Sequence, residues 1–566
     1  MQDTLTGGAL IADQLVAAGV GSVFALGGAG HTHLLLPLEE RGVRLIGTRH
    51  ESGAVGAADG YARATGGIGV ATIIAEQGLP NAITPIQAAY QYGSPVVVIV
   101  TRYPDSWIEA AGEIVVDHHA ALRPITKWVR TVSSPERLGE YLEAAIRIAQ
   151  SGRPGPVVLI MPQNLLAAPV PASAMRPAPV TPLPPEATPE AISALAELLL
   201  AAERPAILVD AGCGGADAIE GLRTLSETHG LPIFGYGGAR GLVGEDDARG
   251  ILPWPYAQYA LPSCDLLIVA GARLTMWYGF GRAPRFPDAL RVAQIDRDAD
   301  AIGRNRAVTL GIVADPGRAM RQLARALSAT GTRVWSQDWL DEALAPRRAA
   351  IEAIPPGEAI HPLALAQAIE ARRPREGVLV GDGADVLNWS YGAFRITRPG
   401  GYMDHHPMGS MGTGMTIAIG AAAAEVDLAA AEGRDAVPVT LLTGDGAFGF
   451  YITELETIAR EALPLRIVVG NDSQWGTEYH GQKLVTGRFV NTRFSLASYA
   501  KVAEGFGMAS ATVDHPVGLD AAIGALFETP APALLDVRID REAGAEIKRD
   551  PRLSFLIFSD LAPPSR

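Results

Sequence analysis

The sequence predicts an α/β protein made of three doubly wound parallel-sheet domains, and three observations support this fold class. A chain of 566 residues is long enough for about three or four domains of ordinary size. Short runs rich in β-branched residues alternate with Ala- and Leu-rich stretches, which is typical of parallel sheets covered by helices. Hydrophobic residues make up 48% of the chain and charged residues 19%, so there is enough apolar material for several cores.

The first predicted domain covers residues 1–168 and leads into a segment dense in proline. Its candidate strands are Arg44–Thr48, Gly69–Ile74 and Pro95–Thr101. Because proline lacks an N–H donor and resists both helix and sheet, we interpret Leu165–Pro189 as an interdomain linker.

Two further α/β blocks follow the linker. The second predicted domain covers residues 186–345, and a softer boundary is expected at Arg347–Glu358, around Pro355 and Pro356. The third covers residues 360–566. The candidate strands of these two domains are Ala206–Asp210, Leu266–Ala270, Val378–Gly381, Val437–Thr443, Leu465–Gly470 and Leu534–Ile539.

Charge, apolar runs and cysteine usage indicate which partners and which location to expect. The net charge is −14 and no block of Lys and Arg is present, which argues against nucleic acid or an anionic membrane as a partner. The N-terminus reads as an amphipathic helix rather than a signal peptide, and no uninterrupted apolar run reaches membrane-spanning length. Cys213 and Cys264 form neither a disulfide framework nor a zinc site, so we expect a cytoplasmic protein.

Two carboxylates follow neighbouring predicted strands in the third domain. Gly444-Asp445-Gly446-Ala447 comes after one strand, and Asn471-Asp472 comes after the next. Parallel strands deliver their carboxyl ends to one edge of the sheet, where ligands bind in such folds. Asp445, Asp472 and a backbone carbonyl near Gln474 would supply the hard oxygen ligands that Mg²⁺ prefers. The glycines let a diphosphate approach the backbone N–H groups at the start of the next helix, although Gly-Asp-Gly alone is more often a simple turn.

This pair of motifs resembles the cofactor signature of the thiamine-diphosphate (ThDP) enzymes of the acetolactate synthase and pyruvate decarboxylase superfamily. The resemblance implies that the first domain binds the pyrimidine of ThDP, that the second is a central domain, and that the third holds the diphosphate and Mg²⁺. Asp472 departs from the pattern, since Asn is common there. A carboxylate is an equally good or harder ligand for Mg²⁺, so the departure changes the charge of the site more than its identity.

The segment from Thr48 to Arg63 is similar to the part of the family that carries a catalytic glutamate. Glu51 stands at the position of that residue, and it would protonate the aminopyrimidine so that the C2 proton of the cofactor can leave. An isolated Glu there would more often only match the dipole of a helix N-terminus. In the family, the cofactor lies between the first domain of one subunit and the third domain of another. The resemblance therefore implies a homodimer or homotetramer with active sites between subunits.

Further residues match cofactor-binding positions of the family. Gly409-Ser410-Met411 resembles the loop whose bulky apolar residue, here Met411, holds ThDP in its bent form; a core Met in a Gly-rich loop is the plainer alternative. Asn81, Trp475 and Gly476 are further candidate cofactor contacts. The central domain resembles the domain that holds FAD in acetolactate synthases, but we expect no FAD.

Within the superfamily, the pattern is most similar to the benzaldehyde lyases, which cleave 2-hydroxyketones to aldehydes. His405 matches an active-site histidine of those enzymes, and Glu113 stands where they have a glutamine. Gly30 replaces their histidine, although His31 is adjacent. Leu387 and Gly481 replace aromatic residues of the benzoyl pocket, which puts an aromatic substrate in doubt.

The candidate acid/base residues are therefore His31, Glu113 and His405, together with Glu478, which falls near a catalytic glutamate of the pyruvate decarboxylases. Weaker candidates, for which a structural role is the more frequent one, are Glu76-Gln77 and Asp117-His118-His119. These side chains would move protons to and from the substrate while the thiazolium acts as an electron sink.

We therefore expect a ThDP-dependent lyase or carboligase that acts on a small carbonyl substrate, a 2-hydroxyketone or a 2-oxo acid, through a C2 carbanion/enamine intermediate. One alternative is an acetolactate-synthase-like transferase or 2-oxoacid decarboxylase. A second is a 2-hydroxyacyl-CoA lyase, since Gly481 leaves room for a larger substrate. A catalytically idle scaffold is a third. The tail Glu546–Arg566 could cover the active site as a lid or pack as an ordinary terminus.

Overall fold

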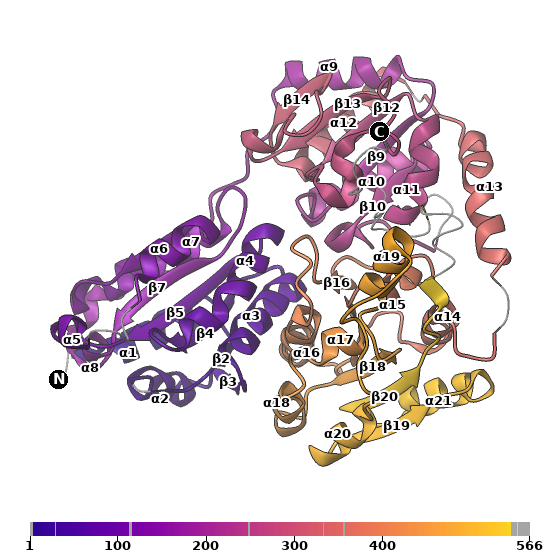
Figure 1. The fold of residues 1–566 in the computed structure, drawn as a ribbon. Coiled ribbons are helices and arrows are strands. Elements are labelled where there is room, and N and C mark those ends of the chain that lie inside the picture. Colours follow the sequence, from indigo (N-terminus) through magenta and orange to yellow (C-terminus); the bar gives the residue numbers. More distant parts are fainter. Residues whose placement is uncertain are drawn as a thin grey trace.

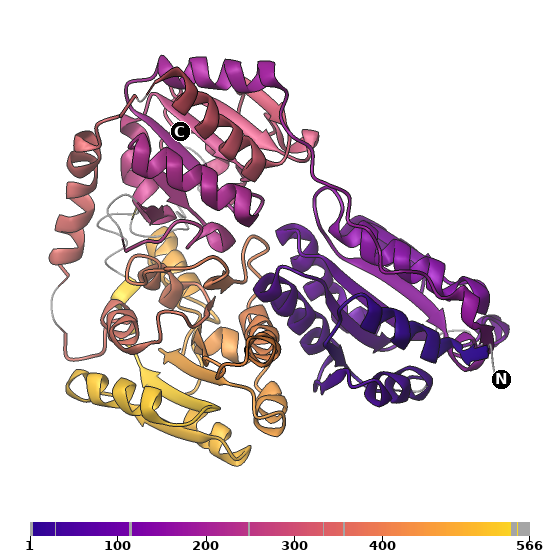
Figure 2. The same cartoon turned by 180° about the vertical axis from the view of Figure 1, so that it is seen from behind.

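The computed structural model describes residues 4–28, 30–111, 116–246, 250–331, 333–354, 357–544 and 552. Three six-stranded parallel sheets, each flanked by helices, follow one another along the chain (Figure 1). The view from behind shows that the middle domain lies at one end of the C-terminal domain, while the N-terminal domain contacts the C-terminal domain from the side (Figure 2). The predicted fold class is confirmed. The predicted lid, Glu546–Arg566, lies outside the described residues apart from Arg552.

The N-terminal sheet has the strand order β3-β2-β4-β5-β7-β6. Its strands are β2 (Ser22–Ala25), β3 (Arg44–Gly47), β4 (Gly69–Ile74), β5 (Val96–Arg102), β6 (Trp128–Thr131) and β7 (Val157–Pro162). Its helices are α1 (Gly7–Ala17), α2 (Thr32–Glu40), α3 (Glu51–Thr65), α4 (Ile83–Tyr92), α5 (Asp105–Ala111), α6 (His118–Leu122), α7 (Leu138–Gln150) and α8 (Gln163–Ala167). The central strands are buried on both faces, as expected for β-branched runs between two layers of helices.

The proline-rich segment is only partly a linker. Pro169–Pro171 forms strand β8, which pairs antiparallel with β1 (Thr4–Thr6) and places Val170 opposite Leu5. The expectation that this segment resists sheet structure is therefore wrong at these residues. An edge strand tolerates proline because only one side of it needs N–H donors.

The middle sheet has the order β11-β10-β9-β12-β13-β14. Its strands are β9 (Pro205–Val209), β10 (Ile233–Gly235), β11 (Ile251–Pro253), β12 (Leu266–Ala270), β13 (Arg291–Asp296) and β14 (Leu310–Val313). The helices of this part are α9 (Pro189–Leu200), α10 (Gly215–Arg223), α11 (Trp254–Ala260), α12 (Pro316–Thr330) and α13 (Asp338–Glu352).

The softer boundary expected at Arg347–Glu358 begins inside a helix. Helix α13 continues through Pro346 as far as Glu352, and the Arg347 guanidinium lies 4.0 Å from the centre of the Tyr256 ring of α11. This packing stabilises a helix across the first half of the predicted boundary. Pro355 and Pro356 lie outside the described residues.

The C-terminal sheet has the order β16-β15-β17-β18-β20-β19. Its strands are β15 (Leu379–Asp382), β16 (Tyr402–Asp404), β17 (Val439–Gly444), β18 (Leu465–Asn471), β19 (Ala509–Val513) and β20 (Ala533–Arg538). Its helices are α14 (Pro362–Arg372), α15 (Asp385–Ser390), α16 (Thr413–Glu432), α17 (Asp445–Phe448), α18 (Glu454–Arg460), α19 (Gly476–Thr486), α20 (Tyr499–Gly505) and α21 (Pro516–Glu528). Every candidate strand of the sequence analysis is present, with ends shifted by at most a residue or two.

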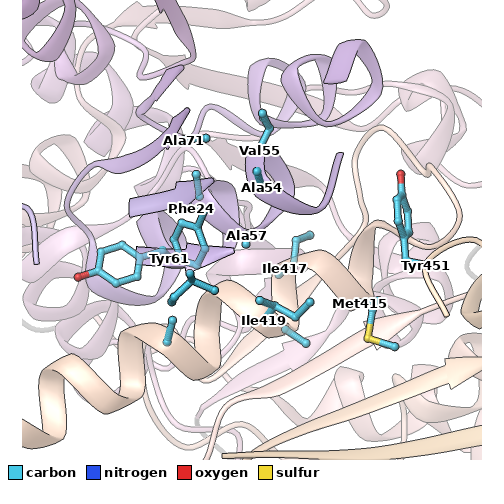
Figure 3. Close-up of a cluster of buried hydrophobic side chains, with 14 of the residues drawn as sticks. Phe24, Ala54, Val55, Ala57, Tyr61, Ala71, Met415, Ile417, Ile419 and Tyr451 are labelled. Carbon is cyan, nitrogen blue, oxygen red and sulfur yellow. The ribbon is translucent and has the colours of Figure 1, made fainter. Parts of the chain in front are cut away.

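The N-terminal and C-terminal domains meet where α3 packs along α16 (Figures 1 and 3). Figure 3 shows Ala57 of α3 facing Ile417 and Ile419 of α16. Glycines allow a very close approach: a Cβ atom added to Gly420 would lie 1.9 Å from the carbonyl oxygen of Ala57, and one added to Gly60 would lie 2.1 Å from that of Ile417. The small residues noticed near Glu51 in the sequence therefore form a backbone-to-backbone contact between domains.

Helix α16 is long and apolar enough to cross a membrane by length and composition, which the sequence analysis did not anticipate. It is the one such helix in the described part of the chain, and most of it is buried against α3 and the C-terminal sheet. A buried core helix satisfies the same criterion, so this helix is weak evidence for a membrane span.

Candidate active site

The two predicted metal ligands lie side by side at the carboxyl edge of the C-terminal sheet. Strands β17 and β18 run parallel with Gly444 opposite Gly470, so Asp445 and Asp472 follow neighbouring strand ends. Both carboxyl groups are buried, with 3% and 6% of their surface exposed. Burial raises the pKa of each, and the proximity of the other carboxylate raises the pKa of Asp472 further. A divalent cation would relieve both penalties.

Backbone amides and glycines surround this pair. The N–H of Gly446 donates to Asp445 Oδ1 at 2.9 Å, and the N–H of Gln474 donates to Asp472 Oδ1 at 3.3 Å. A Cβ atom on Gly446 would lie 2.6 Å from the Trp475 ring, so this position requires glycine. Gly444, Gly446 and Ala447, at the start of α17, line the same cavity as the two carboxylates.

These residues line a cavity of about 240 Å³. The predicted site residues that it brings together are His405, Gly409, Met411, Gly444, Asp445, Gly446, Ala447, Asp472, Gln474, Trp475, Gly476 and Glu478. Ser410 is adjacent in the chain to two of them, and Glu478 is exposed at the start of α19. Leu387 is buried in the hydrophobic core and is not among the lining residues.

Among the described residues, no group of three or more His, Cys, Asp and Glu side chains is arranged to hold a metal ion. Two carboxylates and one carbonyl leave coordination positions for phosphate oxygens and water, which is the usual way in which Mg²⁺ binds. The donor set therefore fits a magnesium diphosphate better than a metal held by protein side chains alone.

The loop that carries Met411 is held by a residue that the sequence analysis missed. The carboxylate of Asp382, at the end of β15, accepts hydrogen bonds from the N–H groups of Gly412 at 3.2 Å and Gly414 at 3.0 Å. Burial raises the pKa of Asp382 to about 7, and the backbone donors oppose this effect. A sequence signal existed, because Gly381-Asp382-Gly383 repeats the Gly-Asp-Gly pattern one strand away.

His405 lies in a buried cluster beside the cavity. Its Nδ1 atom is 3.4 Å from Asp382 Oδ1, and burial lowers its pKa to about 3. The neighbouring Asp404 accepts hydrogen bonds from the Tyr391 hydroxyl and from the N–H of His406 at 3.1 Å. A neutral His405 can donate or accept a proton in a hydrogen bond, but it does not carry a positive charge at neutral pH.

Glu51 stands at the first position of α3 and is 7% exposed. The Asn81 side-chain amide donates to Glu51 Oε2 at 2.9 Å, and the Ser52 hydroxyl donates to the Asn81 carbonyl. Glu454 of the C-terminal domain accepts from the N–H of Arg49 at 3.1 Å, a contact that sequence reasoning did not find. Two predicted residues, Glu51 and Asn81, are thus brought together.

Glu51 and Asn81 are separate from the cavity of Asp445 in the single chain, because every described residue that lines the cavity comes from the middle or C-terminal domain. The other candidates of the first domain are also elsewhere. His31 is 1% exposed, its Nδ1 accepts from the N–H of Gly28 at 3.0 Å, and burial lowers its pKa to about 4. Glu113 lies outside the described residues.

A second cavity, of about 400 Å³, lies at the carboxyl ends of the middle-domain strands. Arg153 of the N-terminal domain lines it together with Arg273 and Arg297 of the middle domain, and Asp296 is among the acidic lining residues. Trp277 lines both cavities, and its indole N–H donates to the Pro407 carbonyl at 2.6 Å. The sequence analysis did not predict that a middle-domain residue forms a wall of the C-terminal cavity.

Three family descriptions match this chain in succession. Residues 5–121 match "Thiamine pyrophosphate enzyme, N-terminal TPP binding domain", residues 192–323 match the central domain of the same enzymes, and residues 378–537 match their C-terminal TPP binding domain.

Curated proteins are similar over nearly the whole chain. 2-Hydroxyacyl-CoA lyase 2 of Bos taurus is 28% identical over 559 residues, which covers 89% of this chain and 84% of that protein. The acetolactate synthase large subunit of Parasynechococcus marenigrum (strain WH8102) is 28% identical over 558 residues, covering 95% and 88%. The acetolactate synthase large subunit IlvG of Mycobacterium tuberculosis (strain ATCC 25618 / H37Rv) is 29% identical over 546 residues, covering 95% and 96%. With the order of its three domains and the glycine-lined carboxylate pair, this chain belongs to the thiamine pyrophosphate enzymes.

Proposed function

We propose that the protein is a magnesium- and ThDP-dependent carbon–carbon lyase or carboligase that acts on 2-hydroxyketones or 2-oxo acids. The observation that carries this proposal is the cavity whose lining joins the Asp445/Asp472 pair, the glycine-rich segment around Gly446 and the apolar Met411. Metal, diphosphate and thiazolium each need one of these three features.

The residues in and beside the cavity divide into three sets by the part of the bound cofactor that they would hold. Asp445, Asp472 and the Gln474 carbonyl would bind Mg²⁺, while Met411 would support the bend of ThDP. The diphosphate and ring contacts would come from Gly409, Ser410, Gly444, Gly446, Ala447, Trp475 and Gly476. When bound, the cofactor supplies an electron sink that accepts the electron pair of a breaking carbon–carbon bond.

Glu51 and Asn81 would reach this cofactor from a second copy of the chain. In a single chain, Glu51 is buried and paired with Asn81, but it does not line the cavity of Asp445. A homodimer or homotetramer would complete each site, and we propose a cytoplasmic location for it.

A 2-hydroxyacyl-CoA is the second candidate substrate, and the arginine-lined cavity favours it. Arg153, Arg273 and Arg297 provide positive charge for phosphate groups, and Trp277 borders both cavities. Relatives named 2-hydroxyacyl-CoA lyase 2 support the same choice. Others named acetolactate synthase keep a 2-oxo acid reaction open. The prediction that no FAD binds the middle domain stays a prediction, as does the closer likeness to the benzaldehyde lyases.

One set of assays tests these choices. Enzyme stripped of cofactor would be restored with ThDP and Mg²⁺ and offered benzoin, acetoin, pyruvate, benzoylformate and a 2-hydroxyacyl-CoA. Aldehyde from a hydroxyketone supports the lyase, aldehyde only from the thioester supports the second candidate, and CO₂ from an oxo acid supports a decarboxylase or synthase.

Glu51→Gln is the test variant for the catalytic glutamate. It can keep the hydrogen bond from Asn81, so it should abolish turnover without loss of folding. The proposal would be contradicted if the stripped enzyme were equally active with and without ThDP and Mg²⁺, or if Glu51→Gln kept full activity.

A further inference from the structure

Glu76 is a buried carboxylate with no role in the cofactor site proposed above. It follows β4, at the carboxyl edge of the N-terminal sheet. The N–H of Ala75 donates to the Thr101 carbonyl at 2.7 Å and continues the pairing with β5, while the N–H of Leu79 donates to the Ala75 carbonyl at 2.8 Å and closes a turn over residues 75–79. The side chain of Glu76 is only 5% exposed.

One oxygen of the Glu76 carboxylate is buried without a hydrogen-bond partner among the described residues. This atom, Oε1, is enclosed and accepts no hydrogen bond from the part of the chain that the structure describes. Buried carboxylates in proteins are nearly always paired or hydrogen-bonded, because losing water costs the charged group a large solvation energy. Among the described residues, Glu76 Oε1 therefore remains available to a ligand or to another chain.

The turn of Glu76 also holds Glu51. A Cβ atom on Gly78 would lie 2.8 Å from Glu51 Oε1, and Asn81, two residues after the end of this turn, donates to Glu51 Oε2. The two carboxylates therefore belong to one edge of the sheet and share one short segment of backbone. A cofactor that meets Glu51 would bring its substrate to the same edge.

Three more buried polar atoms at this edge have no hydrogen-bond partner within the described ranges. They are Thr101 Oγ1 and Arg102 Nε at the end of β5, and His118 Nε2 at the start of α6. Burial lowers the pKa of His118, and the nearby positive charge of Arg102 lowers it further. Unsatisfied buried groups are few in native proteins, so a cluster of them at one sheet edge indicates an incomplete binding site.

We propose that Glu76 is the acid/base residue for the substrate, an inference that rests on the proposed lyase function. In the cleavage of a 2-hydroxyketone, the hydroxyl group loses its proton as the carbon–carbon bond breaks and the first aldehyde forms. The former carbonyl carbon keeps the electron pair and needs one proton before it leaves as the second aldehyde. Glu76 takes the first proton and returns it to this carbon, so that atoms and charge balance. A 2-hydroxyacyl-CoA would require the same transfer.

The test compares Glu76→Gln with Glu39→Gln, which removes an exposed carboxylate on α2 of the same domain. Binding of ThDP with Mg²⁺, measured by isothermal titration, should be unchanged in both variants. Exchange of the cofactor C2 proton in D₂O, measured by NMR after acid quenching, should persist in Glu76→Gln and be lost in Glu51→Gln. Cleavage of acetoin, benzoin or the 2-hydroxyacyl-CoA should fall about 10²- to 10⁴-fold in Glu76→Gln, the usual loss for a missing acid/base group, and stay normal in Glu39→Gln.

The outcomes separate this inference from the proposed function. Normal cleavage by Glu76→Gln would overturn the inference and leave the lyase function intact. Loss of C2 exchange, or of cofactor binding, in Glu76→Gln would also overturn it, because Glu76 would then activate or hold the cofactor. A parent enzyme that cleaves neither hydroxyketones nor the thioester, but consumes a 2-oxo acid with ThDP, would overturn the inference and leave the 2-oxo acid part of the proposed function intact. A parent enzyme that turns over none of these substrates with ThDP and Mg²⁺ would overturn both.

Discussion

Replacing Gly420 by Ala tests the contact between α3 and α16. The added Cβ atom would lie 1.9 Å from the Ala57 carbonyl oxygen, while real Cβ atoms keep at least 3.0 Å from such neighbours. The two helices would therefore have to separate by about 1 Å along a well-packed interface. Overpacking a core costs about 1–3 kcal/mol, and rigid backbone on both sides places this substitution near the upper value. Alanine recovers about 1 kcal/mol through its higher helix propensity, which leaves a net loss of about 2 kcal/mol.

The midpoint of thermal unfolding, followed by calorimetry, measures this loss. For a domain of roughly 150–250 residues, a loss of about 2 kcal/mol lowers the unfolding midpoint by roughly 4–8 °C. Gly505→Ala is the matched control, since Gly505 ends helix α20 and its added Cβ atom would meet open space. That variant should unfold at the parent temperature or slightly above it. Equal midpoints for Gly420→Ala and Gly505→Ala would refute the reasoning.

Three further predictions concern charged groups. Asp445→Ala should weaken the binding of ThDP with Mg²⁺ in isothermal titration, whereas Asp472→Asn, which keeps an oxygen ligand and removes the like charge, should retain it; equal loss in both would contradict the pairing. His31 has a folded pKa of about 4 against an ordinary 6.5, so the unfolded chain binds more protons between these values. Stability should therefore fall as the pH drops through this range, by about 2 kcal/mol at pH 5, and His31→Asn should flatten the dependence of thermal unfolding on pH. Arg63→Met should lower the free energy of unfolding by about 3–5 kcal/mol, because the buried Asp59 carboxylate loses its ion-pair partner at 2.6 Å. The double variant Arg63→Met/Asp59→Leu should recover most of this loss in the same thermal-unfolding assay.

The juxtaposition of Asp445 and Asp472 could be predicted from the sequence because strand ends are local features. Asp445 and Asp472 each follow a run of buried β-branched residues, and parallel pairing then brings them together. Met411 was predicted on other grounds, because its glycine-rich loop resembles the corresponding loop of the family.

The contributions of distant elements could not be predicted in this way. Trp277 reaches the cavity from the middle domain, and Glu454 reaches the start of α3 from the C-terminal domain. No local pattern specifies how separate domains pack. Strand β8 was missed because the partner that stabilises a proline-rich edge, Thr4–Thr6, stands at the other end of its domain.

The position of Trp277 bears on how this scaffold could change its substrate range. The Trp277 ring lines both the cavity of Asp445 and the second cavity, which contains Arg153, Arg273 and Arg297. Its edge packs against the His406 ring, with ring centres 4.4 Å apart and planes at 85°. A smaller residue at position 277 would thin the wall between the two cavities and leave Asp445 and Asp472 unchanged. Selection for longer or shorter acyl chains could therefore act on one codon while the chemistry of the coenzyme stays the same.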